Sequence, residues 1–415
     1  LEVAHVLGHA LLGRGIVDFP KFGVKHGLLM RDDKSRIGGF GAVNDAFPGG
    51  ILADEILTPG PKQVRALFVT GGNPLLTMAN AGRLREAFQN LELLVCLDIF
   101  QGETASLAHW VLPCTSPMQR PDLPFIFPLM LGMQSKPYLQ ATREVVPPRG
   151  EQRDEATIYL DLCRASGLNL FGSRVAQRLL ELGKRRHSKR HPDRQPAIPQ
   201  EFLLDVILRL SGQGRFAQLL AHPHGRAREP HRHDDFLGKR VLTRDGKLDL
   251  APAPLLAEAA KLEAHFERER RDAMRLKLIT RRHITTHNSW THNHEDFVPN
   301  DSNYLYVHPD DAARLGLEED ACADVRSDTA TVRTTVKLLA DLMPGTVALP
   351  HGWGHQHARG LSVAGKTGGV NVNLLAADGP DRLERVSGMA NLTGFCVDVT
   401  PAAGPRDPTS WSGIG

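Results

Sequence analysis

Apolar runs separated by polar segments predict alternating strands and helices in the first part of the chain. A run at 66–69 predicts one strand, and a run at 93–97 predicts another. Between them, apolar residues at helical spacing predict a helix over 82–88, and a third short strand at 111–113 ends in proline. Strands and helices that alternate in this way are typical of a parallel sheet with right-handed crossovers.

The pattern changes further along the chain. Residues 116–150 are rich in proline and predict an irregular segment. Amphipathic stretches then predict helices at 155–164, 174–182, 201–210 and 256–272. Short apolar runs predict strands at 276–280, 305–307, 321–325, 332–338, 347–349 and 395–399. With one small helix at 308–316, this last pattern is typical of a closed or nearly closed β-barrel.

We therefore expect an α/β protein with a Rossmann-like parallel-sheet domain, a helical and irregular linker, and a C-terminal barrel. The expected regions are a glycine-rich N-terminal piece at 1–60, the Rossmann-like domain at 61–170, a basic connecting region at 171–272, the barrel at 273–400 and a disordered tail at 401–415. The glycine-rich start is either a second phosphate loop or a connecting loop, and such stretches are more often connecting loops.

Composition narrows the class of protein. A net charge of +3 over 415 residues does not by itself indicate nucleic acid. The five cysteines are scattered without a Cys-x-x-Cys, so the chain carries no iron–sulfur or zinc-ribbon signature, and a reducing compartment suits them. No apolar run is long enough to span a membrane. We expect a cytoplasmic piece of a longer protein, with the periplasm left open because the chain does not begin with Met.

The turn after the first strand carries candidate chemistry. Gly71-Gly72-Asn73-Pro74 follows the strand at 66–69, and Asp98 ends the strand at 93–97. Glycine lets the backbone approach a phosphate closely, and the free N–H groups of a following helix favour negative charge. A carboxylate on the next strand can accept hydrogen bonds from a ribose or a base. The pattern predicts a nucleotide site, although the turn lacks the full Gly-x-Gly-x-x-Gly of nicotinamide enzymes.

Polar residues also follow the first strand of the barrel. Their hydrogen-bond donors suit an anionic ligand, and the candidates are Arg282, His283, Asn288 and Ser289. A metal site is one alternative, with ligands His283, His287, His292 and His294. No Cys or Glu completes a known ligand order, so we assign no metal ligand. Surface histidines without a role are the other alternative.

Two further motifs lie in the barrel. In His351-Gly352-Trp353-Gly354 the glycines allow a tight turn that presents the ring and backbone N–H groups, or else Trp353 packs in the core. In Asn371-Val372-Asn373 alternate side chains point to one side of an extended chain, so both amides would face one ligand. An amide offers a donor and an acceptor, which matches a pterin or guanine edge. Ordinary turn asparagines are the alternative.

Together these segments resemble the C-terminal part of the molybdopterin oxidoreductase family, also called the dimethyl sulfoxide reductase family. The nearest likeness is to its formate-dehydrogenase-like alpha subunits. The motifs that carry the resemblance are Gly71-Gly72-Asn73-Pro74, Asp98, Glu103-Thr104, Trp110-Val111-Leu112-Pro113, Asp122-Leu123-Pro124, His308-Pro309-Asp310, Met343-Pro344-Gly345, His351-Gly352-Trp353-Gly354 and Asn371-Val372-Asn373. The resemblance covers 45–170 and 274–400.

The resemblance implies a bis(molybdopterin guanine dinucleotide) cofactor with molybdenum or tungsten. It also implies that the barrel is a double-psi barrel and that 1–60 ends an upstream molybdopterin domain. Gly72, Asn73 and Asp98 would hold a guanosine and its pyrophosphate. The full set of implied cofactor-binding residues is Gly71, Gly72, Asn73, Pro74, Asp98, Glu103, Thr104, Arg282, His283, Asn288, Ser289, His351, Trp353, Gly354, Asn371 and Asn373.

Two departures from the family pattern limit the prediction. The metal ligand and the cysteines of the iron–sulfur cluster would lie upstream of this chain. Arg120-Pro121-Asp122-Leu123-Pro124 replaces a Gly-Thr-Phe-x-Asn stretch. We therefore name no catalytic residue. The expected function is part of a formate-dehydrogenase-like two-electron oxidoreductase, inactive alone, with a small-molecule substrate and an electron-transfer subunit as partners.

Three alternatives from other classes stay open. One is a catalytically silent cofactor-binding module, and another is a nicotinamide-dependent dehydrogenase. The third is nucleic-acid binding through the basic runs at 184–194 and 267–282, which we do not favour. The histidine-bearing basic runs at 184–187 and 222–226 lack aromatic residues for base stacking, so surface loops are the better interpretation of them.

Overall fold

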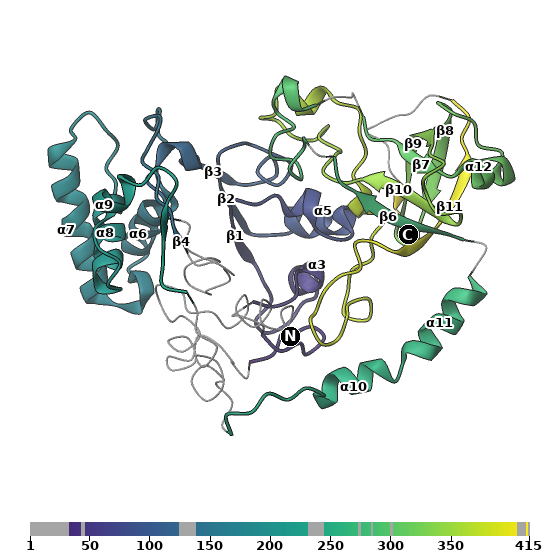
Figure 1. Cartoon of the computed structure of the whole chain (residues 1–415), viewed down its shortest axis with the longest axis horizontal. Helices are drawn as coiled ribbons and strands as arrows, with labels where there is room; N and C mark the ends of the chain where they lie inside the picture. The colour runs from purple at the N-terminus through teal and green to yellow at the C-terminus, as the bar shows by residue number, and fades with distance from the viewer. Residues whose placement is uncertain are drawn as a thin grey trace. The chain divides into compact units, whose positions relative to one another are not determined.

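The computed structural model describes residues 33–42, 46–123, 138–230, 245–272, 275–283, 285–298, 302–404 and 412–413 (Figure 1). The chain divides into two units, which we call the helical unit (1–31 and 112–250) and the sheet-and-barrel unit (32–111 and 251–415). This division falls inside the third strand of the sheet, whereas the five regions expected from the sequence remain a prediction. Most of the expected N-terminal piece lies outside the described residues.

The sheet consists of β1 (Ala66–Thr70), β2 (Leu93–Asp98) and β3 (Trp110–Pro113), in that order. Strands β1 and β2 are parallel, as predicted, with Phe68 opposite Val95. Helices α3 (Leu52–Leu57) and α5 (Ala81–Gln89) bury their apolar faces against this pair, and α4 (Pro74–Thr77) is a single turn after the glycines. Because strand β1 continues into the glycine turn, the turn lies at the carboxyl edge of the sheet.

The second part of the sheet-and-barrel unit is a closed barrel. Its strands are β6 (Leu276–Arg281), β7 (Leu305–Val307), β8 (Cys322–Arg326), β9 (Ala330–Leu338), β10 (Thr346–Pro350) and β11 (Phe395–Pro401). Among the described residues the order is β9-β7-β10-β6-β11-β8, and β8 pairs again with β9 to close the ring. Pairs β10–β6 and β7–β9 are parallel, and the other pairs are antiparallel. The predicted closure is therefore confirmed.

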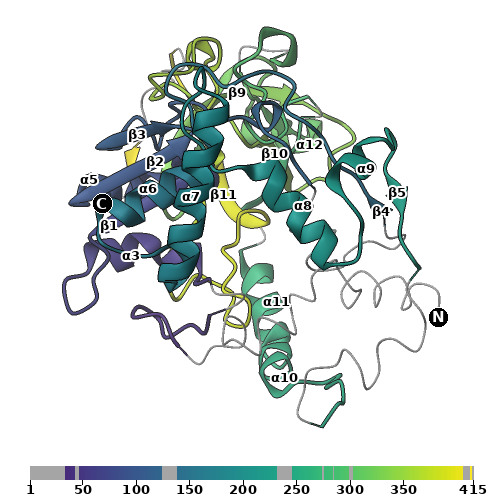
Figure 2. The same ribbon diagram turned by 90° about the vertical axis from the view of Figure 1, so that its left-hand side faces the viewer.

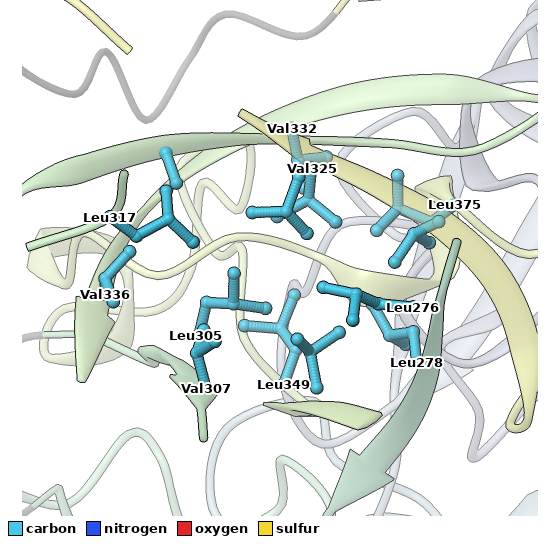
Figure 3. Packing of buried hydrophobic residues seen from close by; sticks show 14 of the residues in the cluster. Leu276, Leu278, Leu305, Val307, Leu317, Val325, Val332, Val336, Leu349 and Leu375 are labelled. Atoms are coloured by element: carbon cyan, nitrogen blue, oxygen red, sulfur yellow. The ribbon is translucent and has the colours of Figure 1, made fainter. Parts of the chain in front are cut away.

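Every second side chain along the strands points into the barrel and fills it. Along β9 every second residue is buried from Ala330 to Val336, because successive strand side chains alternate between the two faces. Figure 3 shows leucine and valine side chains from several strands pointing toward one another inside the ring. Helix α12 (Pro309–Leu315) begins after His308 and ends at Gly316 with φ +67°, as predicted. In the expected disordered tail, β12 (Ser412–Gly413) pairs with β9 instead.

The helical unit contains α6 (Glu155–Ala165), α7 (Arg174–Arg190), α8 (Gln200–Leu210) and α9 (Phe216–Leu220), together with the β4 (Tyr138–Leu139) and β5 (Arg226–Ala227) ribbon (Figure 2). The predicted surface loop at 184–187 is wrong, because α7 continues to Arg190. Lys and Arg are good helix formers and suit the negative carboxyl end of a helix.

The remaining elements are short. The charged stretch predicted as one helix at 256–272 forms two, α10 (Ala253–Ala259) and α11 (Leu262–Arg271). Single 3₁₀ turns are η1 (Gly49–Ile51), η2 (Pro117–Gln119), η4 (Leu170–Gly172), η6 (Glu295–Phe297), η7 (Ala364–Lys366) and η8 (Val372–Leu374). Within the described ranges, no helix combines the length and hydrophobicity needed to cross a membrane.

Candidate functional site

The glycine turn is tied to its neighbouring strand but leaves space beside it. Gly71 has φ +57°, and its N–H donates to the carbonyl of Leu97 at 2.8 Å. No atom lies within 4 Å of the position that a Cβ at Gly71 would occupy. Asn73 is the N-cap residue of α4, and Pro74 fills its first turn. A backbone that is both fixed and open on one side suits a phosphate.

The side chain of Asn73 binds other protein groups. Its Oδ1 accepts from Thr104 N at 3.1 Å and Thr104 Oγ1 at 2.8 Å, and its Nδ2 donates to Glu103 Oε2. Thr104 Oγ1 also accepts from Leu75 N. Glu103 and Thr104 are buried in a hydrogen-bonded turn that follows Gly102. The Asn-Pro and Glu-Thr motifs, which were both expected to contact the cofactor, are therefore hydrogen-bonded to each other.

Asp98 lies where β2 ends, at the same edge of the sheet as the glycine turn. Its Oδ1 accepts from the N–H groups of Ile99 at 2.7 Å and Phe100 at 3.4 Å. Both of these apolar side chains are exposed. Because β1 and β2 are parallel, this carboxylate and the glycine turn share one surface, on which an apolar patch adjoins the acid.

The loops after β6 and β10 lie together in the barrel. The two strands are parallel with Pro350 opposite Arg281, so their loops leave from the same end. His351 Nδ1 donates to the carbonyl of Arg281 at 3.1 Å, and its Nε2 lies 3.0 Å from Asn288 Oδ1. A Cβ at Gly352, where φ is +85°, would stand 1.9 Å from the Asn288 carbonyl oxygen, so the turn requires glycine.

The polar residues of these loops differ in exposure. Arg282 and Asn288 are exposed, and His283 and Ser289 are half-buried. Burial lowers the pKa of His283, with the charge of Arg281 as a further cause. Burial likewise lowers the pKa of His351, although its hydrogen bond to Arg281 opposes the shift. The structure therefore brings together the predicted set from the first barrel loop with His351.

Trp353 packs in the core, which is one of the two arrangements that the sequence left open. The ring is fully buried and lies edge-on to His283 at 6.0 Å and tilted to His292 at 4.7 Å between ring centroids. A Cβ at Gly369 would stand 2.5 Å from this ring, and a Cβ at Gly354 would stand 2.7 Å from Asn371 N. The ring therefore packs in the core and Gly354 allows close backbone packing, while the predicted pterin contacts of Trp353 and Gly354 stay a prediction.

The two asparagines face one side, but that side is protein. Asn371 Nδ2 donates to Leu75 O at 2.9 Å, and Asn373 Nδ2 donates to Leu76 O at 2.8 Å. Helix-end carbonyls lack intrahelical partners, so α4 needs such donors. Both asparagines are buried, and Asn371 Oδ1 accepts from Asn373 N. The two amides therefore hold α4 against the barrel, and their predicted contact with a ligand stays a prediction.

Sequence reasoning missed His355, which completes the interior of the site. This residue is 1% exposed, and its Nδ1 lies 2.9 Å from Glu103 Oε1. Its Nε2 lies 2.9 Å from Gly352 O and 2.9 Å from His292 Nδ1. The sequence signal that could have drawn attention to His355 is its position four residues after His351, on the other side of the Trp-Gly turn. The partner Glu103, 252 residues away, leaves no trace in local pattern.

These contacts set the charges in the interior. Burial raises the pKa of Glu103, but the hydrogen bond and charge of His355, with the Asn73 hydrogen bond, outweigh it and lower the pKa. Burial, aided by His355 and His283, lowers the pKa of His292 to about 3. Glu103 is therefore a carboxylate at neutral pH and His292 is neutral.

The donor set fits an anionic, oxygen-rich cofactor better than a bare metal ion. Within the described residues, no group of three or more His, Cys, Asp or Glu side chains could hold a metal ion. In the two barrel loops, three buried nitrogens have no hydrogen-bond partner among the described residues: His283 Nδ1, His292 Nε2 and Trp353 Nε1. Unpartnered buried polar atoms, an open glycine turn and exposed Arg282 suit ligand oxygens.

Comparison with known proteins identifies the family. The model described as "Molybdopterin oxidoreductase" matches residues 35–165, and "Molydopterin dinucleotide binding domain" matches residues 276–392. The chain belongs to the molybdopterin oxidoreductase family. The two matches of this molybdopterin oxidoreductase chain contain the glycine turn, Asp98 and both barrel loops. The relatives in this family are enzymes.

Three relatives show how varied the family's reactions are. The chain is 25% identical to "NADPH-Fe(3+) oxidoreductase subunit alpha" of Geobacter sulfurreducens over 301 residues, 72% of this chain and 28% of the relative. It is 24% identical to "Trimethylamine-N-oxide reductase" of Haemophilus influenzae over 339 residues, 74% of this chain and 39% of the relative. It is 46% identical to "Formate dehydrogenase H" of Escherichia coli over 54 residues, 13% of this chain and 8% of the relative.

The solved structure of "Acetylene Hydratase from Pelobacter acetylenicus" shares the fold. Its TM-score is 0.62 at 20% identity, and the match covers 85% of this molybdopterin oxidoreductase chain and 46% of the hydratase chain. The chain thus spans less than half the length of these curated relatives and of the solved structure.

Proposed function

We propose that this chain is the cofactor-binding C-terminal part of a two-electron oxidoreductase that carries bis(molybdopterin guanine dinucleotide) with molybdenum or tungsten. When bound, that cofactor supplies the redox chemistry, and the protein positions it and excludes water. The single observation that carries the proposal is the shared edge of β1 and β2, where the open turn at Gly71 meets the carboxylate of Asp98.

The sheet edge is the proposed seat of one guanosine arm. The Gly71 N–H already donates to Leu97, so the N–H of Gly72 would face the pyrophosphate, since the turn is open at Gly71. The carboxylate of Asp98 accepts hydrogen bonds, so it can pair with both N1–H and the 2-amino group of guanine. Exposed Phe100 offers an apolar surface beside it. Asn73, Glu103 and Thr104 would fix the turn without touching the ligand.

The barrel loops are the proposed contact for the pterin and its phosphates. Arg282 is exposed and always charged, and a guanidinium pairs well with phosphate oxygens. His283, Asn288, Ser289 and His351 lie in or beside the same pair of loops. We also propose that the barrel has the double-psi connection, and its mixed parallel and antiparallel pairing supports this.

The proposed reaction is formate-like two-electron oxidation. The 46% identity to formate dehydrogenase H over 54 residues supports it, while the other relatives are named for different reactions. An electron-transfer partner is proposed because one relative is itself named a subunit. A cytoplasmic location is proposed on the scattered cysteines alone.

Guanosine diphosphate titration of the purified chain tests the site. We expect Asp98→Asn to weaken binding by about tenfold or more, since a bidentate pair to a base contributes about 1–3 kcal/mol. The control is Asp341→Asn, an exposed acid in a barrel turn. Adenosine diphosphate should bind less tightly than guanosine diphosphate, because adenine lacks both donors. A preference for adenosine diphosphate would instead support a nicotinamide enzyme.

The redox function needs the longer protein. We expect the full open reading frame that contains this chain to yield protein with molybdenum or tungsten and with pterin fluorescence after oxidation. Formate should then reduce an artificial electron acceptor in the presence of this protein. Purified full-length protein with neither metal nor pterin would refute the proposed cofactor. Cofactor without turnover on formate or other substrates would support a silent binding module.

A further inference from the structure

The buried contacts of His355 join it to Glu103. Asn73 Oδ1 accepts from a backbone N–H, that of Thr104, so the amide orientation is fixed and Nδ2 must donate to Glu103 Oε2. The other carboxylate oxygen faces His355 Nδ1 at 2.9 Å. A carboxylate only accepts, so His355 Nδ1 carries the hydrogen of this contact. The Nε2 of His355 lies 2.9 Å from the carbonyl oxygen of Gly352.

His292 packs against the same ring. Its Nδ1 lies 2.9 Å from His355 Nε2, and its Nε2 has no hydrogen-bond partner among the described residues. The other charged or titratable groups that act here are Arg85 and His357, near Glu103, and His283 and His351, near His292.

The contact between Glu103 and His355 joins two loops that are far apart in the sequence. One path runs from the turn at Asn73 through Glu103 to His355, and from there to the carbonyl of Gly352. The first loop carries the glycine turn, and the second follows β10 and packs on Asn288. Removing one partner of a buried hydrogen bond leaves the other unsatisfied, which is destabilising. The two loops therefore have a shared anchor.

We propose that His355 is a positioning residue: buried and hydrogen-bonded to Glu103, it locks the glycine turn at 71–74 to the barrel turn at 351–354. Its effect on ligand affinity rests on the cofactor site proposed above, whereas the lock itself does not. His355 contacts no ligand in this assignment. It acts by holding backbone N–H groups and the Asn73 side chain in place.

Nitrogen NMR of histidine-labelled protein reads the hydrogen bond directly. We expect His355 Nδ1, which faces the Glu103 carboxylate, to resonate as a protonated nitrogen. Glu103→Gln keeps the shape of the side chain but removes the carboxylate, so the Nδ1 resonance of His355 should shift. His355→Gln assigns the resonances. A His355 Nδ1 without a hydrogen in the unmodified protein would overturn the proposal.

Hydrogen exchange tests the lock without any ligand. In His355→Gln and in Glu103→Gln, we expect amides at 71–77 and at 352–355 to exchange about tenfold faster or more, both sets together. His294→Gln is the matched control, since His294 is exposed and its acid, Asp296, lies 3.8 Å away. Faster exchange at only one of the two loops in both variants would refute the lock. If His355→Gln fails to fold, Glu103→Gln alone decides.

Guanosine diphosphate affinity then separates this proposal from the proposed function. We expect Glu103→Gln to weaken binding about tenfold while Asp98→Asn weakens it without changing the His355 resonances. If the unmodified chain binds no guanosine diphosphate but the exchange result holds, the cofactor site fails and the lock stands. If Glu103→Gln and His355→Gln bind as tightly as the unmodified chain, the positioning role is refuted.

Discussion

Two polar regions of the sheet-and-barrel unit are built in opposite ways. The inner region is defined by Asn73, Glu103, Thr104 and His355. Asn73 is half-buried, the other three are buried, and their polar side chains bind one another. The outer region, defined by Asp98, Arg282, Asn288 and His351, is exposed or half-buried. Both regions come from the same family motifs. The difference teaches that a motif residue can serve a site by shaping its backbone rather than by touching the ligand.

Removing Glu103 should give the largest effect. Glu103→Ala leaves the His355 Nδ1–H and the Asn73 amide without an acceptor. Each unsatisfied buried donor costs about 1–3 kcal/mol, so we expect a loss of about 2–6 kcal/mol in unfolding free energy. Urea denaturation at neutral pH measures it. Glu92→Ala removes an acid from the exposed pair with Arg65 and should leave the midpoint almost unchanged. Equal effects of the two substitutions would show that Glu103 of the inner region stabilises the fold no more than an exposed ion pair does.

Two glycines sharpen the same comparison. Gly352→Ala places a Cβ against the Asn288 carbonyl, and we expect a loss of about 1–3 kcal/mol or more from overpacking. Gly71→Ala meets no atom within 4 Å, so only its positive φ costs, about 1–2 kcal/mol. Thermal denaturation ranks the two. For guanosine diphosphate binding we expect the reverse order, because the Cβ at Gly71 fills the proposed phosphate space.

Lowering the pH should lower the stability of the fold through His292, which contacts His355 of the inner region. Its folded-state pKa is about 3, below the unfolded value of about 6.5, so the unfolded state binds protons first as pH falls. Stability is therefore complete above about pH 6.5 and falls by up to about 1.4 kcal/mol per pH unit below it. His292→Gln should flatten this dependence between about pH 6 and pH 4 in urea titrations. An unchanged slope would show that His292 does not remain neutral in the fold.

Arg282 should give the smallest effect on stability. The side chain is exposed, so Arg282→Ala should leave the melting temperature unchanged. In the outer region its charge would serve a ligand, and we expect weaker binding of pyrophosphate-containing nucleotides with a smaller salt dependence. Binding assays at two salt concentrations test this. A lower melting temperature with unchanged nucleotide binding would show that Arg282 stabilises the fold, as the inner region does, and does not bind the ligand.

Local pattern predicted most of the elements and few of the contacts between them. The strands of the sheet and barrel follow from alternation and apolar runs, which depend on neighbours in the sequence. Helix α7 ran past its expected end because the basic run at 184–187 was interpreted as a loop. The break between α10 and α11 left no glycine or proline to mark it.

The site was predicted at the level of motifs but not of roles. The glycine turn and Asp98 stand at one sheet edge, as strand order requires. The asparagines of the last motif were expected to contact a ligand. An amide donates equally well to a ligand oxygen and to a backbone carbonyl, so the sequence does not distinguish the two. Only the position of α4 shows that Leu75 and Leu76 supply those carbonyls. Such long-range partners are set by tertiary packing, which residue spacing does not encode.

The bonds from Asn371 and Asn373 to α4 also decide where this chain can be cut. A fragment that starts at residue 273 would contain every barrel strand yet lose the acceptors at Leu75 and Leu76 and the carboxylate at Glu103. Its Asn371 and Asn373 amides and the His355 ring would then face solvent or have no hydrogen-bond partner. A shortened protein for biophysical work should instead keep 32–111 and 251–415 and replace the intervening helical unit by a flexible linker.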